Sequence, residues 1–146
     1  MYKAKQIAEY IVWRLNKGDL GYSTISNLKL QKVLYFLQAE FLVSTGSPLF
    51  SDKIIAWDFG PVVEDVYQEY KIFGGAFIPG QFKKHSPLIA KDDADRIDVM
   101  LKELDQYSNT YLTDLVHHQK PWRNNYIRGC NMVIPNSDIK AYFTED

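Results

Sequence analysis

The stretch NLKLQKVLYFLQAEFLVS, residues 27–44, decides the fold that this sequence predicts. Apolar residues recur in it at helical spacing and cover more than half of the helix circumference, which indicates burial on several sides. Ser26 or Asn27 can cap the start of the helix, and Gly46-Ser47-Pro48 ends it. We therefore predict a central helix, with apolar positions Leu28, Leu30, Val33, Leu34, Leu37, Phe41 and Leu42.

Shorter segments on both sides of this stretch also have helical periodicity and plausible start and stop residues. The predicted helices are residues 3–16, about 62–73, 92–106, the segment after Ser108, a turn from Pro121 to near Gly129, and a short final helix around Ile139 and Phe143.

Two short runs, residues 54–59 and 132–135, are expected to be extended. Gly60-Pro61 is expected to break the first run and to begin the helix that follows, because proline suits a first helical turn. Residues 18–23 and 76–91 are expected to be irregular. The predicted fold class is mainly α: a compact single-domain helical bundle with at most a minor β-hairpin, formed by residues 53–58 and 131–135.

Length and composition are those of one globular domain spanning residues 1–146, with 46% hydrophobic and 24% charged residues. The net charge of -1 argues against phosphate-backbone binding as the main activity, so we expect at most weak, salt-dependent binding to duplex DNA. The aromatic fraction of 14% is the unusual feature of the composition, and it suits either packing or a recognition surface.

Three features of the sequence indicate the cellular compartment: its cysteine content, the lack of a membrane-spanning pattern and the lack of a signal peptide. A single cysteine, Cys130, excludes an internal disulfide and a cysteine-cluster metal site. No apolar stretch approaches the roughly 18–20 residues of a membrane span. The first residues lack a signal-peptide pattern. We expect a cytoplasmic protein that meets a membrane only through a partner.

Familiar catalytic and cofactor motifs are absent, including a glycine-rich phosphate loop, His-Glu-x-x-His and Gly-x-Ser-x-Gly. His117 and His118 would diverge by about 100° on a helix, so they are poorly placed to share a metal. We predict no catalytic residue, cofactor or metal ligand, and a structural or interface role for His117. The enzyme alternative would use His117 with Asp58 or Cys130.

Several residues have two interpretations that the sequence leaves open. Residues 117–128 contain no acidic side chain and follow an acid-rich predicted helix at 92–105, so they could meet an acidic partner or fold back on that helix. Trp57 and Trp122 could be packing residues or recognition anchors. Gly60 indicates either a close backbone approach or a positive φ.

Two lysines of the central helix share one side of it. Lys29 and Lys32 are three residues apart, which predicts that both mark the same rim.

Three blocks of the sequence, in order, resemble the Panacea, or SocA-like, domain family, which includes phage-associated GepA-like proteins. The first is Asn27-Leu28-Lys29-Leu30-Gln31-Lys32-Val33-Leu34-Tyr35-Phe36, similar to the family's signature helix. The second is Pro48-Leu49-Phe50 followed by Ala56-Trp57-Asp58-Phe59-Gly60-Pro61-Val62-Val63 and Val66-Tyr67, and the third is Leu112-Thr113-Asp114-Leu115-Val116-His117 with Pro121-Trp122. Val116 stands where the family usually has threonine.

The resemblance implies a non-enzymatic antitoxin that neutralises a cognate protein toxin, encoded nearby, by direct binding. It also implies a second type of partner, a host protease or chaperone, because some family members act as proteolytic adaptors. The alternative is a phage or mobile-element protein that acts as an adaptor or inhibitor of a host defence or proteolysis component.

A partner surface is predicted around the Gly60-Pro61 turn, where large residues with polar handles lie beside breaks in the motifs. We expect its members to form the toxin-contact patch or to support it: Trp57, Asp58, Gly60, Pro61, Tyr67, His117 and Trp122, with a charged rim of Lys120, Arg123 and Arg128. The core is expected to contain Leu28, Leu34, Leu37, Val66, Leu101 and Leu104.

Overall fold

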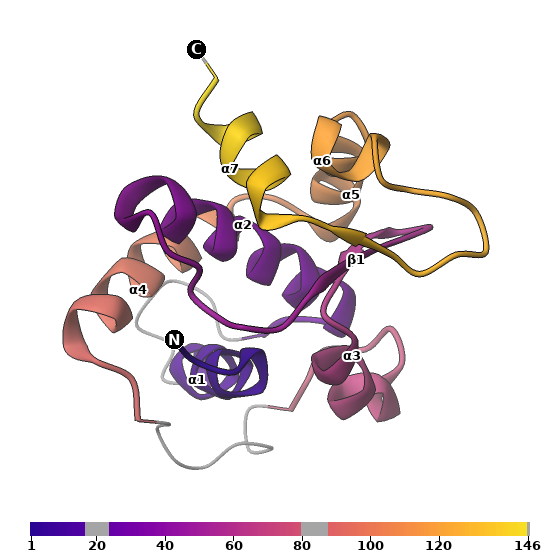
Figure 1. The fold of residues 1–146 in the computed structure, drawn as a ribbon. Helices are drawn as coiled ribbons and strands as arrows, with labels where there is room; N and C mark the ends of the chain where they lie inside the picture. The colour runs from indigo at the N-terminus through magenta and orange to yellow at the C-terminus, as the bar shows by residue number, and fades with distance from the viewer. Residues whose placement is uncertain (17–23, 80–87, 146) are drawn as a thin grey trace.

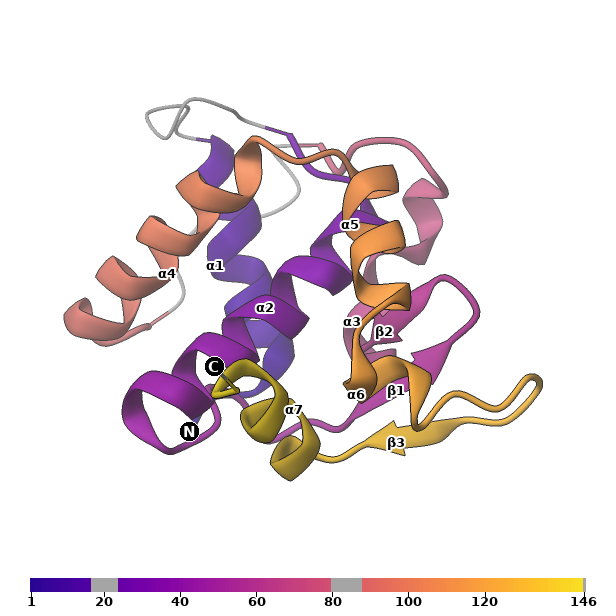
Figure 2. The same cartoon turned by 90° about the horizontal axis from the view of Figure 1, so that it is seen from above.

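Helix α2 (Asn27–Thr45) runs through the middle of the structure, and the other elements surround it (Figures 1 and 2). The computed structural model describes residues 1–16, 24–79 and 88–145. Ser26 caps the start of α2, because its side chain accepts a hydrogen bond from the backbone N–H of Lys29. Gly46, at φ +79°, ends the helix in the left-handed region, as its lack of Cβ allows. The predicted central helix is confirmed.

Six further α-helices and one 3₁₀ turn make up most of the remaining described chain, which confirms a mainly α fold. They are α1 (Ala4–Asn16), α3 (Glu64–Tyr70), the 3₁₀ turn η1 (Lys71–Phe73), α4 (Lys91–Asp105), α5 (Asn109–His117), α6 (Lys120–Arg123) and α7 (Asn136–Phe143). The predicted turn from Pro121 to near Gly129 is shorter than expected, since α6 ends at Arg123.

A three-stranded antiparallel sheet of order β2-β1-β3 lies beside α5 and α6 (Figure 2). Its strands are β1 (Ile54–Trp57), β2 (Gly60–Val62) and β3 (Met132–Ile134). The predicted pairing of β1 with β3 is confirmed, with Ile55 opposite Val133.

The second strand, β2, was not predicted, and the expectation that Gly60-Pro61 begins a helix is wrong. Trp57 pairs with Gly60 and Ala56 pairs with Pro61 across a two-residue turn. Proline is compatible with this position because β2 is an edge strand, where a missing N–H removes no inner ladder bond. Helix α3 therefore begins only at Glu64.

The core is one cluster of buried apolar residues contributed by most of the helices and by the sheet. Of the residues expected there, five are buried: Leu34, Leu37, Val66, Leu101 and Leu104. Leu28 is only half-buried, because it lies in the first turn of α2 at the end of the helix.

Two buried glutamines of α2 bind the backbone of segments that cross the helix. Gln38 Oε1 accepts hydrogen bonds from the N–H groups of Leu49 and Phe50 at 2.9 and 3.2 Å, and its Nε2 donates to the carbonyl of Phe50 at 3.0 Å. Gln31 Oε1 accepts from the N–H of Val63 at 2.9 Å. These bonds attach both ends of the hairpin segment to one helix.

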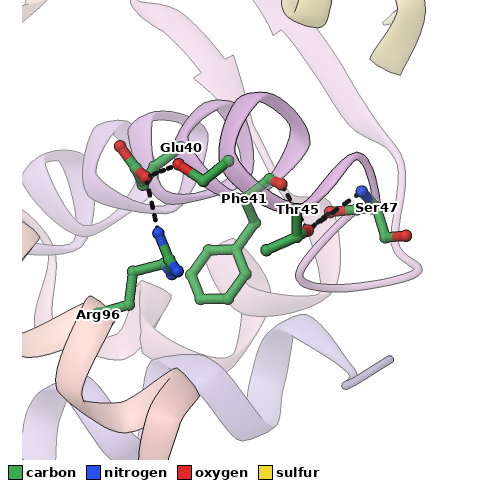
Figure 3. A network of polar contacts seen from close by, with 6 residues as sticks. Glu40, Phe41, Thr45, Ser47 and Arg96 are labelled. Carbon is green, nitrogen blue, oxygen red and sulfur yellow. Dashed lines mark hydrogen bonds and ion pairs between the residues drawn. The ribbon is translucent and has the colours of Figure 1, made fainter.

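Helix α4 is joined to α2 by the network in Figure 3. Arg96 pairs with Glu40 at 3.3 Å and lies over the ring of Phe41, with 5.7 Å between guanidinium carbon and ring centroid. Further along α2, the Thr45 hydroxyl donates to the carbonyl of Phe41. The opposite side of α4 faces α1, where the Asp98 carboxylate accepts from Tyr10 and Arg14.

The irregular segments were predicted in part. Residues 18–23 and 80–87 lie outside the described residues. On either side of the second gap, residues 76–79 and 88–90 have no helix or strand, as expected. Ile78 is nevertheless buried, since its N–H donates to the carbonyl of Ile25. None of the helices described here is long and apolar enough to cross a membrane.

We expect Gln38→Leu to destabilise the fold by roughly 2–5 kcal/mol, because two backbone N–H groups would be left buried without acceptors. Urea denaturation measures this change. Gln68→Leu, at an exposed position of α3, is the matched control and should change stability by about 0.5 kcal/mol or less. Equal effects of the two substitutions would contradict the anchoring role of Gln38.

Candidate functional site

The turn between β1 and β2 brings together three aromatic side chains. The ring centroids of Trp57 and Tyr67 are 5.1 Å apart, and those of Trp57 and Phe59 are 5.8 Å apart, both in edge-to-face geometry. Phe59 also stacks on Tyr67 at 6.1 Å. All three residues are half-buried, so each keeps part of its surface exposed to solvent. Edge-to-face pairs of this kind stabilise the cluster beyond their apolar burial.

A second aromatic group from the α5–α6 region lies against the same turn. Trp122 is 4.3 Å from the His117 ring and 4.5 Å from the Tyr126 ring, centroid to centroid. Trp122 Nε1 donates to the carbonyl of Trp57 at 2.8 Å. The imidazole and phenol on either side of it both bind Asp58, one at its carbonyl and the other at its carboxylate.

We call this assembly the hairpin patch: Trp57, Asp58, Phe59, Tyr67, His117, Trp122 and Tyr126.

Histidine 117 contacts the backbone of Asp58 and not its carboxylate. Its Nε2 lies 2.9 Å from the Asp58 carbonyl oxygen, and because a carbonyl can only accept, this nitrogen carries the proton. The Asp58 carboxylate accepts instead from the Tyr126 hydroxyl, and this bond raises the pKa of Tyr126. The arrangement holds the turn in place, and it does not pair the His117 imidazole with a carboxylate.

The structure brings together most of the residues predicted for this surface. Trp57, Tyr67, His117 and Trp122 meet around the Gly60 turn, as predicted from their size, their polar groups and their positions beside turns. Pro61 is buried within β2 beneath it.

Two members of the patch, Phe59 and Tyr126, were missed by the sequence analysis. Phe59 directly precedes Gly60, and this position in a turn was the available signal. Tyr126 had no such signal, because its contact with Asp58 joins residues 68 positions apart.

The predicted charged rim is exposed, and the fold-back alternative for residues 117–128 is not what the structure has. Lys120 pairs with Glu145 at 3.4 Å, and Arg123 and Arg128 are exposed. Within the ranges that the structure describes, no ion pair joins this stretch to α4.

A shallow hollow of about 260 Å³ opens beside the patch. It is lined by Trp57, Asp58, Phe59, Tyr126, Gly129, Cys130 and Asn131. Trp57 Nε1 donates to Asn131 across it at 3.0 Å, which fixes the indole. No group of three His, Cys, Asp or Glu side chains in the described ranges could hold a metal ion.

A larger hollow of about 490 Å³ lies on α4, away from the patch residues. Its lining combines three acidic residues, one arginine and two apolar residues: Glu40, Asp92, Asp95, Arg96, Val99 and Met100. An adaptor would have a second surface available here. That alternative role stays a prediction.

Lys32 lies beneath the hairpin patch, and the expectation that it marks the same rim as Lys29 is wrong. Its side chain is fully buried, and its Nζ has no hydrogen-bond partner among the described residues. Burial lowers the pKa of Lys32 to about 8. Lys29, its expected companion, is half-buried.

Gly60 allows the turn to approach Lys32 closely. Its φ of +122° lies in a region that side chains disfavour, and a Cβ there would be 3.3 Å from Lys32 Cε and 3.6 Å from Val116 Cγ2. Both interpretations offered for this glycine, close approach and positive φ, are therefore confirmed.

Fold and site together define a small, mainly α-helical domain with a half-exposed aromatic patch bordered by basic residues, a composition typical of protein-recognition surfaces. Residues 30–123 match the family described as "Antitoxin SocA-like, Panacea domain", and the chain belongs to this family. The resemblance noted from the sequence is thereby confirmed.

A curated relative, "Antitoxin SocA" of Caulobacter vibrioides (strain NA1000 / CB15N), is 48% identical over 54 residues. The aligned segment is 37% of this chain and 29% of the relative, so the similarity spans less than a third of that protein. No solved structure matches the chain.

We expect Lys32→Met to stabilise the isolated protein at pH 7 by an amount on the order of 3 kcal/mol, because it removes an unpaired buried charge. Lys32 is protonated in the folded state below about pH 8 and in the unfolded state below roughly pH 10.4. The buried charge therefore lowers the free energy of unfolding by its full amount below pH 8, and this destabilisation declines as the pH rises above 8. Denaturation from pH 7 to 10 should show the advantage of Lys32→Met shrinking.

Lys102→Met, which removes an exposed lysine of α4, is the control for this experiment. A stability difference between Lys32→Met and wild type that is independent of pH would show that Lys32 is not a desolvated cation.

Proposed function

We propose that this protein is an antitoxin that binds a cognate protein toxin directly through the hairpin patch and occludes its active surface. The observation that carries the proposal is the half-exposed aromatic cluster at the β1–β2 turn in a chain of the SocA-like antitoxin family. The mechanism is steric and electrostatic, and it requires no turnover.

The patch is suited to binding because the indole rings of its two tryptophans are held in place before a partner arrives. The Trp57 indole is fixed by Asn131, and the Trp122 indole by the Trp57 carbonyl. Ordered aromatic side chains lose little conformational entropy on association, and tryptophan and tyrosine are enriched among the residues that dominate interface energies. Trp57 and Trp122 are therefore the expected anchors, and Tyr67 packs against Trp57.

Basic residues at the edge of the patch set the polarity of the expected partner. Arg123 and Arg128 are exposed, and in the described part of the chain neither forms an ion pair. Exposed charges at the rim of an interface mainly accelerate encounter with a surface of opposite sign. The toxin surface is expected to be acidic where it meets this rim.

We expect Trp57→Ala to weaken toxin binding by about 2 kcal/mol or more, which is roughly 30-fold, and to reduce the free energy of unfolding by a smaller amount.

Arg123→Ala should lower the rate of association with the toxin and the salt dependence of that rate, while leaving the melting temperature unchanged. Surface plasmon resonance and thermal denaturation measure the two quantities. Tyr111→Ala is the control, since this tyrosine is 51% exposed but lies outside the patch. If the patch variants lose stability and keep their affinity, the interface lies elsewhere.

Co-expression with the product of the neighbouring gene tests the function itself. That product alone should arrest growth, and this protein should restore it. A harmless neighbour, or one that remains toxic in the presence of this protein, would contradict the proposal. His117→Ala separates binding from catalysis, because the enzyme alternative requires this variant to bind normally but fail to neutralise.

A further inference from the structure

Lys32 presents three hydrogen-bond donors with no acceptor among the described residues, directly under the surface that the proposed function assigns to binding. Nζ is buried, without a partner in the described chain, and lies 5.8 Å from the centroid of the Phe59 ring. Buried charges in proteins are normally paired, because a lone buried cation is costly. The arrangement around Lys32 is therefore incomplete in the isolated chain.

The β1–β2 turn covers Lys32 with backbone and one aromatic ring. Gly60 is itself buried and contributes no side chain, and a Cβ at this position would lie 3.3 Å from Lys32 Cε and 3.9 Å from Nζ. Phe59, whose ring lies over the ammonium, is only half-buried and is held by contacts with Trp57 and Tyr67. Opening a route to the ammonium from the turn therefore requires a rotamer change of this one side chain.

We propose that the protein partner supplies the missing acceptor: an aspartate or glutamate carboxylate that enters at the β1–β2 turn, displaces the Phe59 ring and pairs with the Lys32 ammonium. This inference rests on the proposed function and names the partner chemistry that the hairpin patch selects.

The surroundings favour a carboxylate over a neutral acceptor. The acidic group on the same turn, Asp58, is engaged by the Tyr126 hydroxyl and does not compensate Lys32. Arg123 and Arg128, which are close in sequence to the patch residues Trp122 and Tyr126, add exposed positive charge. An ionised acceptor forms a shorter and stronger bond with an ammonium than a carbonyl does.

A pairing of this kind gives Lys32 opposite effects on stability and on binding. In the isolated protein the unpaired charge is unfavourable, so its removal stabilises the fold. In the complex the same removal leaves the partner carboxylate buried without a counter-charge, and truncation of one member of a buried pair mainly raises the dissociation rate. A residue that only filled space in the core would not separate the two effects in this way.

The binding experiment uses the purified product of the neighbouring gene as the probe. The Lys32→Met variant should bind the probe at least tenfold more weakly than wild type does, because the complex dissociates faster. The melting temperature of the isolated variant should be equal to or above that of wild type. Lys102→Met removes one positive charge from the exposed side of α4 and should bind like wild type. A double-mutant cycle against Asp→Asn and Glu→Gln variants of the probe should reveal one carboxylate coupled to Lys32.

The outcomes distinguish this inference from the proposed function. If Trp57→Ala loses binding while Lys32→Met keeps it, the hairpin patch binds the toxin and the carboxylate proposal is wrong. If neither variant changes binding, or the probe does not bind, the proposed function fails and the inference fails with it.

Chemical acetylation of the isolated protein tests the access route without any partner. Lys32 should resist N-hydroxysuccinimidyl acetate in the wild type, as judged by mass spectrometry, and should become labelled in Phe59→Ala. Protection of Lys32 in a folded Phe59→Ala variant would overturn the proposed route under the Phe59 ring.

Discussion

The rest of the structure depends on the hydrogen bonds between the buried glutamine side chains of α2 and the backbone of the segments that cross this helix. Gln38 holds the segment that leads into β1, and Gln31 holds the residue that precedes α3. The hairpin between these two points is short, so its position follows from them. Such bonds are costly to leave unmade in a dry core, and they therefore select one placement of the chain.

The hairpin patch is a consequence of that placement. Once β1 and β2 lie across α2, the Trp57 and Asp58 carbonyls face α5 and α6, where Trp122 and His117 donate to them. The same polar bonds that satisfy the turn also order the indole and imidazole rings at the surface. Preorganisation for binding and stability of the hairpin thus have one physical origin.

Lys32 is the exception to the satisfied polar network of α2. Its neighbours on the helix, Gln31 and Tyr35, are hydrogen-bonded, whereas its ammonium is buried with no acceptor in the described chain. A fold that is selected for stability alone has no use for such a group. Natural proteins depart from local rules of packing and polar satisfaction mainly at functional sites, and this departure lies beneath the surface assigned to binding.

The sequence by itself determined where most of the helices lie, the central position of α2, the β1–β3 pairing and the family, because periodicity, caps and motif blocks are local signals. It also placed Trp57, Tyr67, His117 and Trp122 near one turn. Only the tertiary structure decided that Gly60-Pro61 is a strand, that Tyr126 joins the patch and that Lys32 is buried. The Tyr126 contact and the burial of Lys32 depend on residues distant in sequence, and the spacing of residues along one segment contains no information about such contacts. The Gly60-Pro61 strand pairs with residues only three and five positions away, but a proline after a glycine suits both an edge strand and a first helical turn, and the hydrogen bond of Val63 to Gln31 in α2 is a tertiary contact.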